Sequence, residues 1–243
     1  QRLADLITEA IGPFAYRAFV DSAPVMEKPL GQNAGLGWIG KNTNLIDPVT
    51  GSWFFLGELY TDLPLPVDSP HIDHCGSCTR CAEACPTNAL DVPYQLDATL
   101  CIAYLTIEHK SSIPEALRPM IGNRIFGCDD CQLVCPHNRE PGQGDEIFSA
   151  RDGLDDISLL ELFSWTPKTF AEYTQGSAIR RLGYERWMRN LAVALGNGPP
   201  DEPVIAALRA RLGAVSEMVD EHIHWALGRL GETPAATNMR DRS

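Results

Sequence analysis

The most informative segment of the sequence is Cys75-Gly-Ser-Cys78-Thr-Arg-Cys81-Ala-Glu-Ala-Cys85-Pro86. It has the spacing C-x2-C-x2-C-x3-C-P, in which cysteine thiolates bind 4Fe–4S clusters. The first three cysteines are close enough to wrap one cluster in a tight loop. We expect the fourth, Cys85, to start a helix, to point away and to serve another cluster.

The second group of cysteines is Cys128-Asp-Asp-Cys131-Gln-Leu-Val-Cys135-Pro136, with the isolated Cys101 upstream. It departs from the second run of a bacterial ferredoxin, whose first cysteine would here be displaced to Cys101. The eight cysteines of the chain still make two sets of four. We predict two 4Fe–4S clusters with crossed ligands: Cys75, Cys78, Cys81 and Cys135 for the first, and Cys85, Cys101, Cys128 and Cys131 for the second.

Two other uses of these cysteines are less favoured. Zinc sites could use the C-x2-C pairs, but they do not need the C-x3-C-P endings. Disulfides would need an oxidising compartment, and we find no secretory signal. The pattern therefore favours iron–sulfur ligation by these cysteines and a cytoplasmic protein.

Composition narrows the class of protein. The chain has 243 residues, 44% of them hydrophobic, and no apolar run of the roughly 20 residues that a membrane helix needs. Its net charge of −12 argues against a general nucleic-acid coat protein but leaves room for a local basic face. Because the chain starts with Gln1 in a helical pattern, we expect a fragment without its N-terminal portion.

Residues 1–70 read as an α/β portion within an overall α+β fold. We expect a helix over 2–11, a strand over 18–20, and a helix or loop over 25–34. Strands over 43–46 and 52–60 should form a hairpin around the turn at 47–51. Prolines at 64, 66 and 70 mark the boundary to the next domain.

The remaining chain divides into a cysteine module at 71–140, a helical region at 150–232 and a tail at 233–243. Apolar residues at helical spacing predict helices over 183–196, 203–212 and 219–230. Gly196, Gly213 and Gly231 stand where these helices should stop. The helix pair is typical of a HEAT-like repeat, although a small helical cap on the core is about as good a reading.

Four segments resemble the epoxyqueuosine reductase family of tRNA queuosine synthesis. They are Phe19-Val-Asp-Ser-Ala-Pro24, Ala34-Gly-Leu-Gly-Trp-Ile-Gly-Lys-Asn42, Gly51-Ser-Trp-Phe-Phe-Leu-Gly-Glu58 and Asn123-Arg-Ile-Phe-Gly-Cys-Asp-Asp-Cys-Gln-Leu-Val-Cys-Pro136. The displaced Cys101 also fits this family better than a plain ferredoxin. The family has a further N-terminal portion that helps to enclose a corrinoid, so the resemblance implies an N-terminally truncated member.

The resemblance implies a function. It implies reduction of epoxyqueuosine to queuosine at the tRNA wobble position, with electrons passing through two 4Fe–4S clusters to cobalamin. The partners would be tRNA carrying epoxyqueuosine and an electron donor such as a flavodoxin or ferredoxin. We expect a monomer without membrane attachment, and the fragment alone could be inactive.

The resemblance also assigns site residues. Asp21, at the end of an apolar strand, matches the family's catalytic aspartate and would be the proton donor; a buried carboxyl with a raised pKa could hold that proton. From the residues alone, an N-cap role for Asp21 is favoured. Trp38 and Trp53 should be packing residues. The predicted cobalamin contacts are Asp21, Gly37, Lys41, Asn42, Ser52 and Leu56.

Basic residues are the candidates for contact with tRNA phosphates or an unpaired base. The predicted set is His109, Lys110, Arg124, Arg180, Arg181 and Arg189. For any single residue of this set, a solvated surface charge without a role in tRNA binding is the favoured interpretation.

Two other functions compete with the reductase. A reductive dehalogenase-like corrinoid enzyme would share cobalamin and two clusters but act on a small organohalide. A ferredoxin-type electron carrier would explain the cysteines, but it leaves residues 1–68 and 150–243 without a role.

Overall fold

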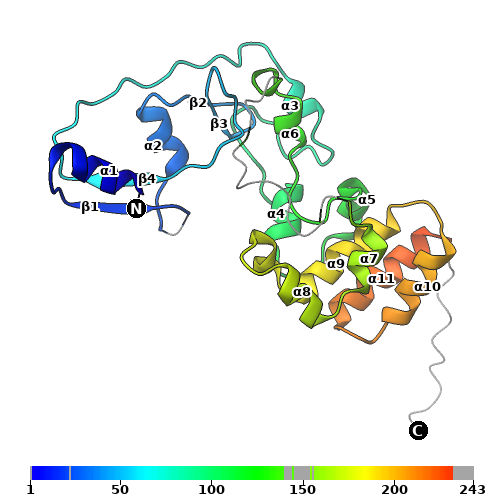
Figure 1. Cartoon of the computed structure of the whole chain (residues 1–243). Helices are drawn as coiled ribbons and strands as arrows, with labels where there is room; N and C mark the ends of the chain where they lie inside the picture. Colours follow the sequence, from blue (N-terminus) through cyan, green and yellow to red (C-terminus); the bar gives the residue numbers. More distant parts are fainter. Residues whose placement is uncertain (1, 22, 140–143, 145–153, 155, 232–243) are drawn as a thin grey trace, which may run out of the picture. The chain divides into compact units, whose positions relative to one another are not determined.

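A computed structural model describes residues 2–21, 23–139, 144, 154 and 156–231 (Figure 1). The predicted tail 233–243 and most of residues 141–153 lie outside these residues. Among the described residues, none of the helices has the length and apolar character needed to cross a membrane.

The chain forms two compact units, which are described separately below. The first comprises Gln1–Cys85, Leu90–Leu96 and Asp130–Gly144. The second comprises Pro86–Ala89, Asp97–Asp129 and Asp145–Ser243. Because residues of the cysteine module fall in both units, this division differs from the predicted domains 1–70, 71–140 and 150–232, which stay a prediction.

The first unit begins with helix α1 (Arg2–Ile11), as the periodicity predicted. Strand β1 (Tyr16–Phe19) pairs antiparallel with strand β4 (Glu58–Thr61). The register places Tyr16 opposite Thr61 and Phe19 opposite Glu58. This pairing brings the chain end that leads into Asp21 next to the end of the segment 51–58.

A second short antiparallel pair follows helix α2 (Glu27–Asn33): strand β2 (Trp38–Ile39) with strand β3 (Leu45–Ile46). The predicted hairpin between 43–46 and 52–60 is therefore wrong, since each of its strands pairs with an earlier one. Residues 52–57 are not a strand, and β4 starts at Glu58.

The turn at 47–51 does form, even though the hairpin does not. Asp47 and Gly51 exchange backbone hydrogen bonds of 2.8 and 3.0 Å, and the Asp47 carboxylate accepts from the Val49 and Thr50 amides. Gly51 has a φ of 76°, and a Cβ there would lie 2.0 Å from Asn138 Oδ1. Glycine is required there, both for the backbone angle and for the approach of Asn138.

The cysteine segments of the first unit carry very short helices, α3 (Arg80–Glu83) and α6 (Asp130–Leu133). These two helices pack on each other. Contrary to our expectation, Cys85 does not start a helix; it follows α3, and Cys81 lies inside that helix. The helical turn thus comes one cysteine earlier than the spacing suggested.

The second unit is a helical assembly around α9 (Gly183–Gly196), which is buried from Trp187 to its end. The other helices are α4 (Ile102–Ile107), η1 (Glu115–Leu117), α5 (Arg118–Ile121), α7 (Leu159–Ser164), α8 (Pro167–Tyr173), η4 (Ala178–Leu182), α10 (Glu202–Arg211) and α11 (Glu217–Arg229). Four of them begin at a hydroxyl N-cap, Ser158, Thr166, Ser177 or Ser216, whose oxygen accepts a backbone N–H.

The three predicted C-terminal helices are confirmed to within a few residues as α9, α10 and α11. Leu191, Leu208 and Ile223 are fully buried in their common core. Gly196 lies against α11 so closely that a Cβ would sit 2.7 Å from the Ala226 Cα. The assignment to a HEAT-like repeat stays a prediction.

Candidate iron–sulfur site

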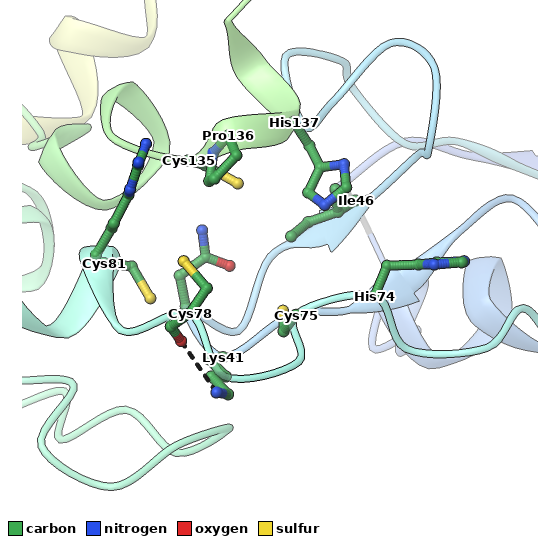
Figure 2. A pocket seen from close by; sticks show the side chains of 11 residues that line it. Lys41, Ile46, His74, Cys75, Cys78, Cys81, Cys135, Pro136 and His137 are labelled. Carbon is green, nitrogen blue, oxygen red and sulfur yellow. Dashed lines mark hydrogen bonds between the residues drawn. The ribbon is translucent and has the colours of Figure 1, made fainter.

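Four cysteines of the first unit line one cavity of about 160 Å³. They are Cys75, Cys78, Cys81 and Cys135, which is the first predicted ligand set (Figure 2). Three come from the loop 75–81 and the fourth from the end of the segment that carries α6. The crossed pairing predicted from spacing is therefore compatible with the geometry of this unit.

The first loop is held in place by Lys41. Its ammonium donates to the Gly76 carbonyl at 2.6 Å and to the Cys78 carbonyl at 3.0 Å, the second of which Figure 2 shows. Gly76 has a φ of 48°, which lets the loop turn sharply between its first two cysteines. Lys41 thus satisfies two carbonyls that the tight loop leaves without a helical partner.

A carboxylate fixes the entry to the same loop. Asp73 Oδ1 accepts from the Cys75 amide at 2.8 Å, and its Oδ2 accepts from the Tyr94 hydroxyl at 2.5 Å. The hydrogen bond to Asp73 raises the pKa of Tyr94 to about 12. Tyr94 therefore keeps its proton at neutral pH and remains a donor.

A buried polar group supports the segment that carries Cys135. Asn138 donates to the Gln132 carbonyl at 2.8 Å and to Ser52 Oγ at 2.9 Å, while its Oδ1 accepts from the Ser52 amide at 2.7 Å. Ser52 Oγ in turn donates to Gln132 Oε1 at 2.9 Å. Because these groups satisfy one another, they tie residues 51–52 to the end of the second cysteine segment.

Two of the four thiols of this cavity have a raised pKa. Burial raises the pKa of the Cys81 and Cys135 thiols, and the nearby Cys75 and Cys78 raise it further. Since cysteine ligates as thiolate, loading of the site must release protons.

The donor set fits an iron–sulfur cluster. Four cysteines line one cavity, and a 4Fe–4S cluster is held by four cysteine sulfurs.

The second predicted ligand set is split between the units. Cys85 and Cys131 belong to the first unit, and Cys101 and Cys128 to the second. The side-chain Nδ2 of Asn44 donates to Cys131 Sγ at 4.0 Å, a long contact. This second set stays a prediction.

The predicted cobalamin contacts are largely engaged inside the first unit. Lys41 and Ser52 are bound as described, and Asn42, 4% exposed, donates to the Cys131 carbonyl at 3.2 Å. A Cβ on Gly37 would lie 2.1 Å from the Ile46 carbonyl oxygen, so this glycine serves β2–β3 packing. Leu56 is half-buried. These polar groups hold the cysteine segments, and their role as cobalamin contacts stays a prediction.

Asp21 follows β1 with a φ of 51°, a left-handed backbone angle that few residues other than glycine adopt. Its side chain is exposed, so our expectation of a buried carboxyl is wrong for the described chain. Strained backbone of this kind gathers at functional sites, which keeps Asp21 of interest.

The predicted tRNA-binding residues fall into two groups. Lys110, Arg180 and Arg181 are exposed, and Arg181 pairs with Glu108 at 2.9 Å. His109 and Arg124 are partly buried, with contacts to the Ser112 and Ile121 carbonyls respectively.

Arg189 is a correction. It is 0% exposed, and it donates to the carbonyls of Leu105, His109 and Ser111 at 2.6 to 2.8 Å. Its guanidinium joins α9 to the segment around α4 within the second unit, so it has no surface to offer to tRNA. Burial lowers the pKa of Arg189 to about 10, which still leaves it charged at neutral pH.

Sequence reasoning missed the residues that hold the cysteine loops: Asp73, Tyr94, Gln132 and Asn138. The predicted packing role is confirmed for the buried Trp38 and wrong for the exposed Trp53. Sequence reasoning missed that the indole N–H of Trp38 also donates to Cys75 Sγ at 3.4 Å. No sequence motif predicts these hydrogen bonds, because each residue depends on a contact between segments 21 to 86 residues apart.

Comparison with known proteins agrees with the cysteine geometry. A family model described as a 4Fe-4S double cluster binding domain matches residues 74–138. The chain is 58% identical over 232 residues to an epoxyqueuosine reductase of Xanthomonas campestris pv. campestris, and the match covers 95% of this chain and 65% of that protein. The resemblance inferred from the four segments is thereby confirmed.

Solved structures give the same result. An epoxyqueuosine reductase crystallised with an epoxyqueuosine-modified tRNA-Tyr stem loop matches with a TM-score of 0.88 and 30% identity, over 95% of this chain and 62% of that one. A Bacillus subtilis epoxyqueuosine reductase, whose catalytic aspartate loop is swung out of the active site, matches with a TM-score of 0.83 and 29% identity, over 94% and 61%. The chain thus spans less than two thirds of the length of these relatives.

Proposed function

We propose that this chain, similar over nearly its whole length to epoxyqueuosine reductases, serves the reduction of epoxyqueuosine to queuosine at the tRNA wobble position. The observation that carries the proposal is the cavity of Cys75, Cys78, Cys81 and Cys135 in a chain that is 58% identical to such a reductase. The relatives are oxidoreductases, and a four-sulfur site is what an oxidoreductase needs to move single electrons.

The proposed electron path uses two 4Fe–4S clusters. The first would be held by the cavity cysteines, and the second by Cys85, Cys101, Cys128 and Cys131. A flavodoxin or ferredoxin is the proposed donor, and cobalamin would supply a low-valent cobalt centre for the epoxide. Cobalamin rests on the family resemblance, since the predicted contacts that this chain offers are mostly engaged elsewhere.

Asp21 is the proposed proton donor. Reduction of an epoxide releases an oxygen that must be protonated, because hydroxide is a poor leaving group. Asp21 stands at the end of β1 with a strained backbone, and the Bacillus subtilis relative is described by a catalytic aspartate loop. An exposed carboxyl group at such a loop can meet a substrate that enters from solvent.

The proposed substrate is tRNA with epoxyqueuosine in its anticodon loop. A relative has been crystallised with such a stem loop. On this chain Lys110, Arg180 and Arg181 are exposed cations that could meet phosphates, whereas Arg189 is not. We further infer a cytoplasmic monomer with a HEAT-like region at 150–232.

The deciding experiment is nucleoside analysis of tRNA from a strain that lacks the gene. Epoxyqueuosine should accumulate and queuosine should disappear, and the intact gene should restore queuosine. Normal queuosine in a strain with no second reductase would reject the proposal. It would leave the dehalogenase-like enzyme or the electron carrier.

The same strain tests Asp21. An Asp21→Asn gene should restore no queuosine, while a gene with Asp68→Asn, an exposed carboxyl of the same unit, should restore it. The purified Asp21→Asn protein should still hold about eight iron atoms per chain. Full queuosine from the Asp21→Asn gene would remove Asp21 from the mechanism.

A further inference from the structure

Trp38 contacts the first cluster site directly. It is 1% exposed, lies in β2, and its indole Nε1–H donates to Cys75 Sγ at 3.4 Å. Cys75 is the first ligand of the cavity described above. The indole therefore places a polar hydrogen on one of the four sulfurs that would bind iron.

The direction of this N–H is fixed by the surroundings of the ring. Trp38 is paired with Ile46 across β2–β3, and it packs with Ile46 and Cys135. Three imidazole rings enclose it, those of His71, His74 and His137, with ring centroids 4.8 to 5.8 Å away. A side chain packed on this many sides cannot rotate without displacing the core of the unit.

A hydrogen bond to a ligand sulfur affects the two redox states differently. Reduction adds one negative charge to the cluster, and part of that charge lies on the cysteine sulfurs. An N–H donor is therefore worth more in the reduced state than in the oxidised state. It shifts the equilibrium towards the reduced cluster and raises the reduction potential.

We propose that Trp38 is a positioning residue that raises the reduction potential of the Cys75 cluster through its hydrogen bond to Cys75 Sγ. This inference rests on the proposed cluster at Cys75, Cys78, Cys81 and Cys135, but not on the proposed tRNA substrate. It gives the tryptophan a chemical role that phenylalanine could not serve. The same packing without the N–H would leave the potential lower.

The test compares wild type with two variants of the whole chain, reconstituted anaerobically with iron and sulfide. Trp38→Phe removes the indole, and 3-benzothienylalanine at position 38 keeps the shape of the ring while replacing the N–H with sulfur. The matched control is Trp53→Phe, which removes a partly exposed indole of the same unit. The readout is the midpoint potential of each cluster in a titration followed by electron paramagnetic resonance.

Both substitutions at position 38 should shift the reduction equilibrium of one cluster about tenfold towards the oxidised form, which is ~59 mV for a one-electron couple. The control should shift neither cluster. In wild type with ¹⁵N-labelled indole, the reduced cluster should show a ¹⁵N hyperfine coupling that both substitutions abolish.

Three outcomes overturn the proposal. Unchanged potentials in a benzothienylalanine protein that holds both clusters would reduce Trp38 to a packing residue, with the cluster assignment intact. A Trp38→Phe shift that benzothienylalanine does not reproduce would mean that ring shape, not the N–H, sets the potential. A wild-type chain that assembles no cluster on Cys75 would overturn this inference and the cluster assignment together.

Discussion

The two units of the chain are stabilised in different ways. In the first unit the cysteine segments carry four-residue helices, and hydrogen bonds tie them to distant residues. Lys41 donates to the Gly76 carbonyl, Asn138 donates to Ser52 Oγ, and Asp73 accepts from the Tyr94 hydroxyl. In the second unit long helices bury a continuous apolar core around α9 and α11. We infer that the first unit is organised around its proposed cluster, and the second around its own apolar side chains.

The largest expected effect is the response of the first unit to iron removal. Stripping iron from the reconstituted protein with a chelator should expose the amides of 75–83 and 130–138 to hydrogen exchange, because metal ligation is part of the folding free energy of such a site. The amides of α9 and α11 should stay protected. Exchange measured by mass spectrometry checks both units at once, and unchanged protection at 75–83 would contradict the comparison.

The second effect is confined to the helical unit. Arg189→Met should lower the free energy of unfolding of this unit by about 3 kcal/mol, because three buried carbonyls lose their donor. Urea denaturation, monitored through the helical signal of the protein, measures this change in the free energy of unfolding. The control Arg180→Met, at an exposed position of the same unit, should stay within about 0.5 kcal/mol of wild type.

The third effect is a pH dependence of the helical unit. Burial lowers the pKa of His222 to about 4, and its ring accepts from the Ile113 amide at 3.1 Å and donates to the Met218 carbonyl at 2.7 Å. The unfolded chain, with an ordinary histidine pKa near 6.5, binds a proton first as the pH falls. The contribution of His222 to the free energy of unfolding is therefore fully present above about pH 6.5 and is lost as the pH falls towards 4.

Lowering the pH from 7 to 5 should reduce the free energy of unfolding of this unit by about 2 kcal/mol through His222. Urea denaturation at both pH values measures the loss, and the difference between wild type and His222→Gln isolates the contribution of the imidazole from that of Glu221. An equal pH dependence in both proteins would show that His222 is not the group responsible.

The smallest effect returns to the first unit. Lys41→Met should let a chelator remove iron from the Cys75 cluster about fivefold faster, since the loop loses its two hydrogen bonds from Lys41. Lys28→Met is the control, because the Lys28 ammonium donates to a single carbonyl of the same unit, that of Thr43. Equal rates in the two variants would mean that Lys41 does not hold the loop.

The sequence predicted best what depends on neighbours along the chain. Helices α9 to α11 follow from apolar spacing and from stop glycines such as Gly196, and the first ligand set follows from cysteine spacing. Both signals are local, apart from the assignment of Cys135, which needed the crossed ligand pattern of a known two-cluster fold.

What the sequence did not predict depends on which segments meet. The strand over 58–61 pairs with 16–19 rather than with its neighbour, and nothing in the alternation of a four-residue strand selects its partner. Arg189 looks like a surface cation until its helix is seen to be buried. The hydrogen bonds of Lys41 and Asn42 to carbonyls of the cysteine segments were not predicted either, because they join residues 35 and 89 positions apart.

The position of Cys135 in the sequence has a consequence for biosynthesis. Cys135 reaches the cavity from a part of the chain that the ribosome makes well after Cys75, Cys78 and Cys81. During that interval the emerging chain carries three cavity thiols without their fourth partner, and such thiols are open to oxidation or to capture of a wrong metal. If the four cysteines hold the proposed cluster together, its ligand set is complete only after the segment around α6 has left the ribosome.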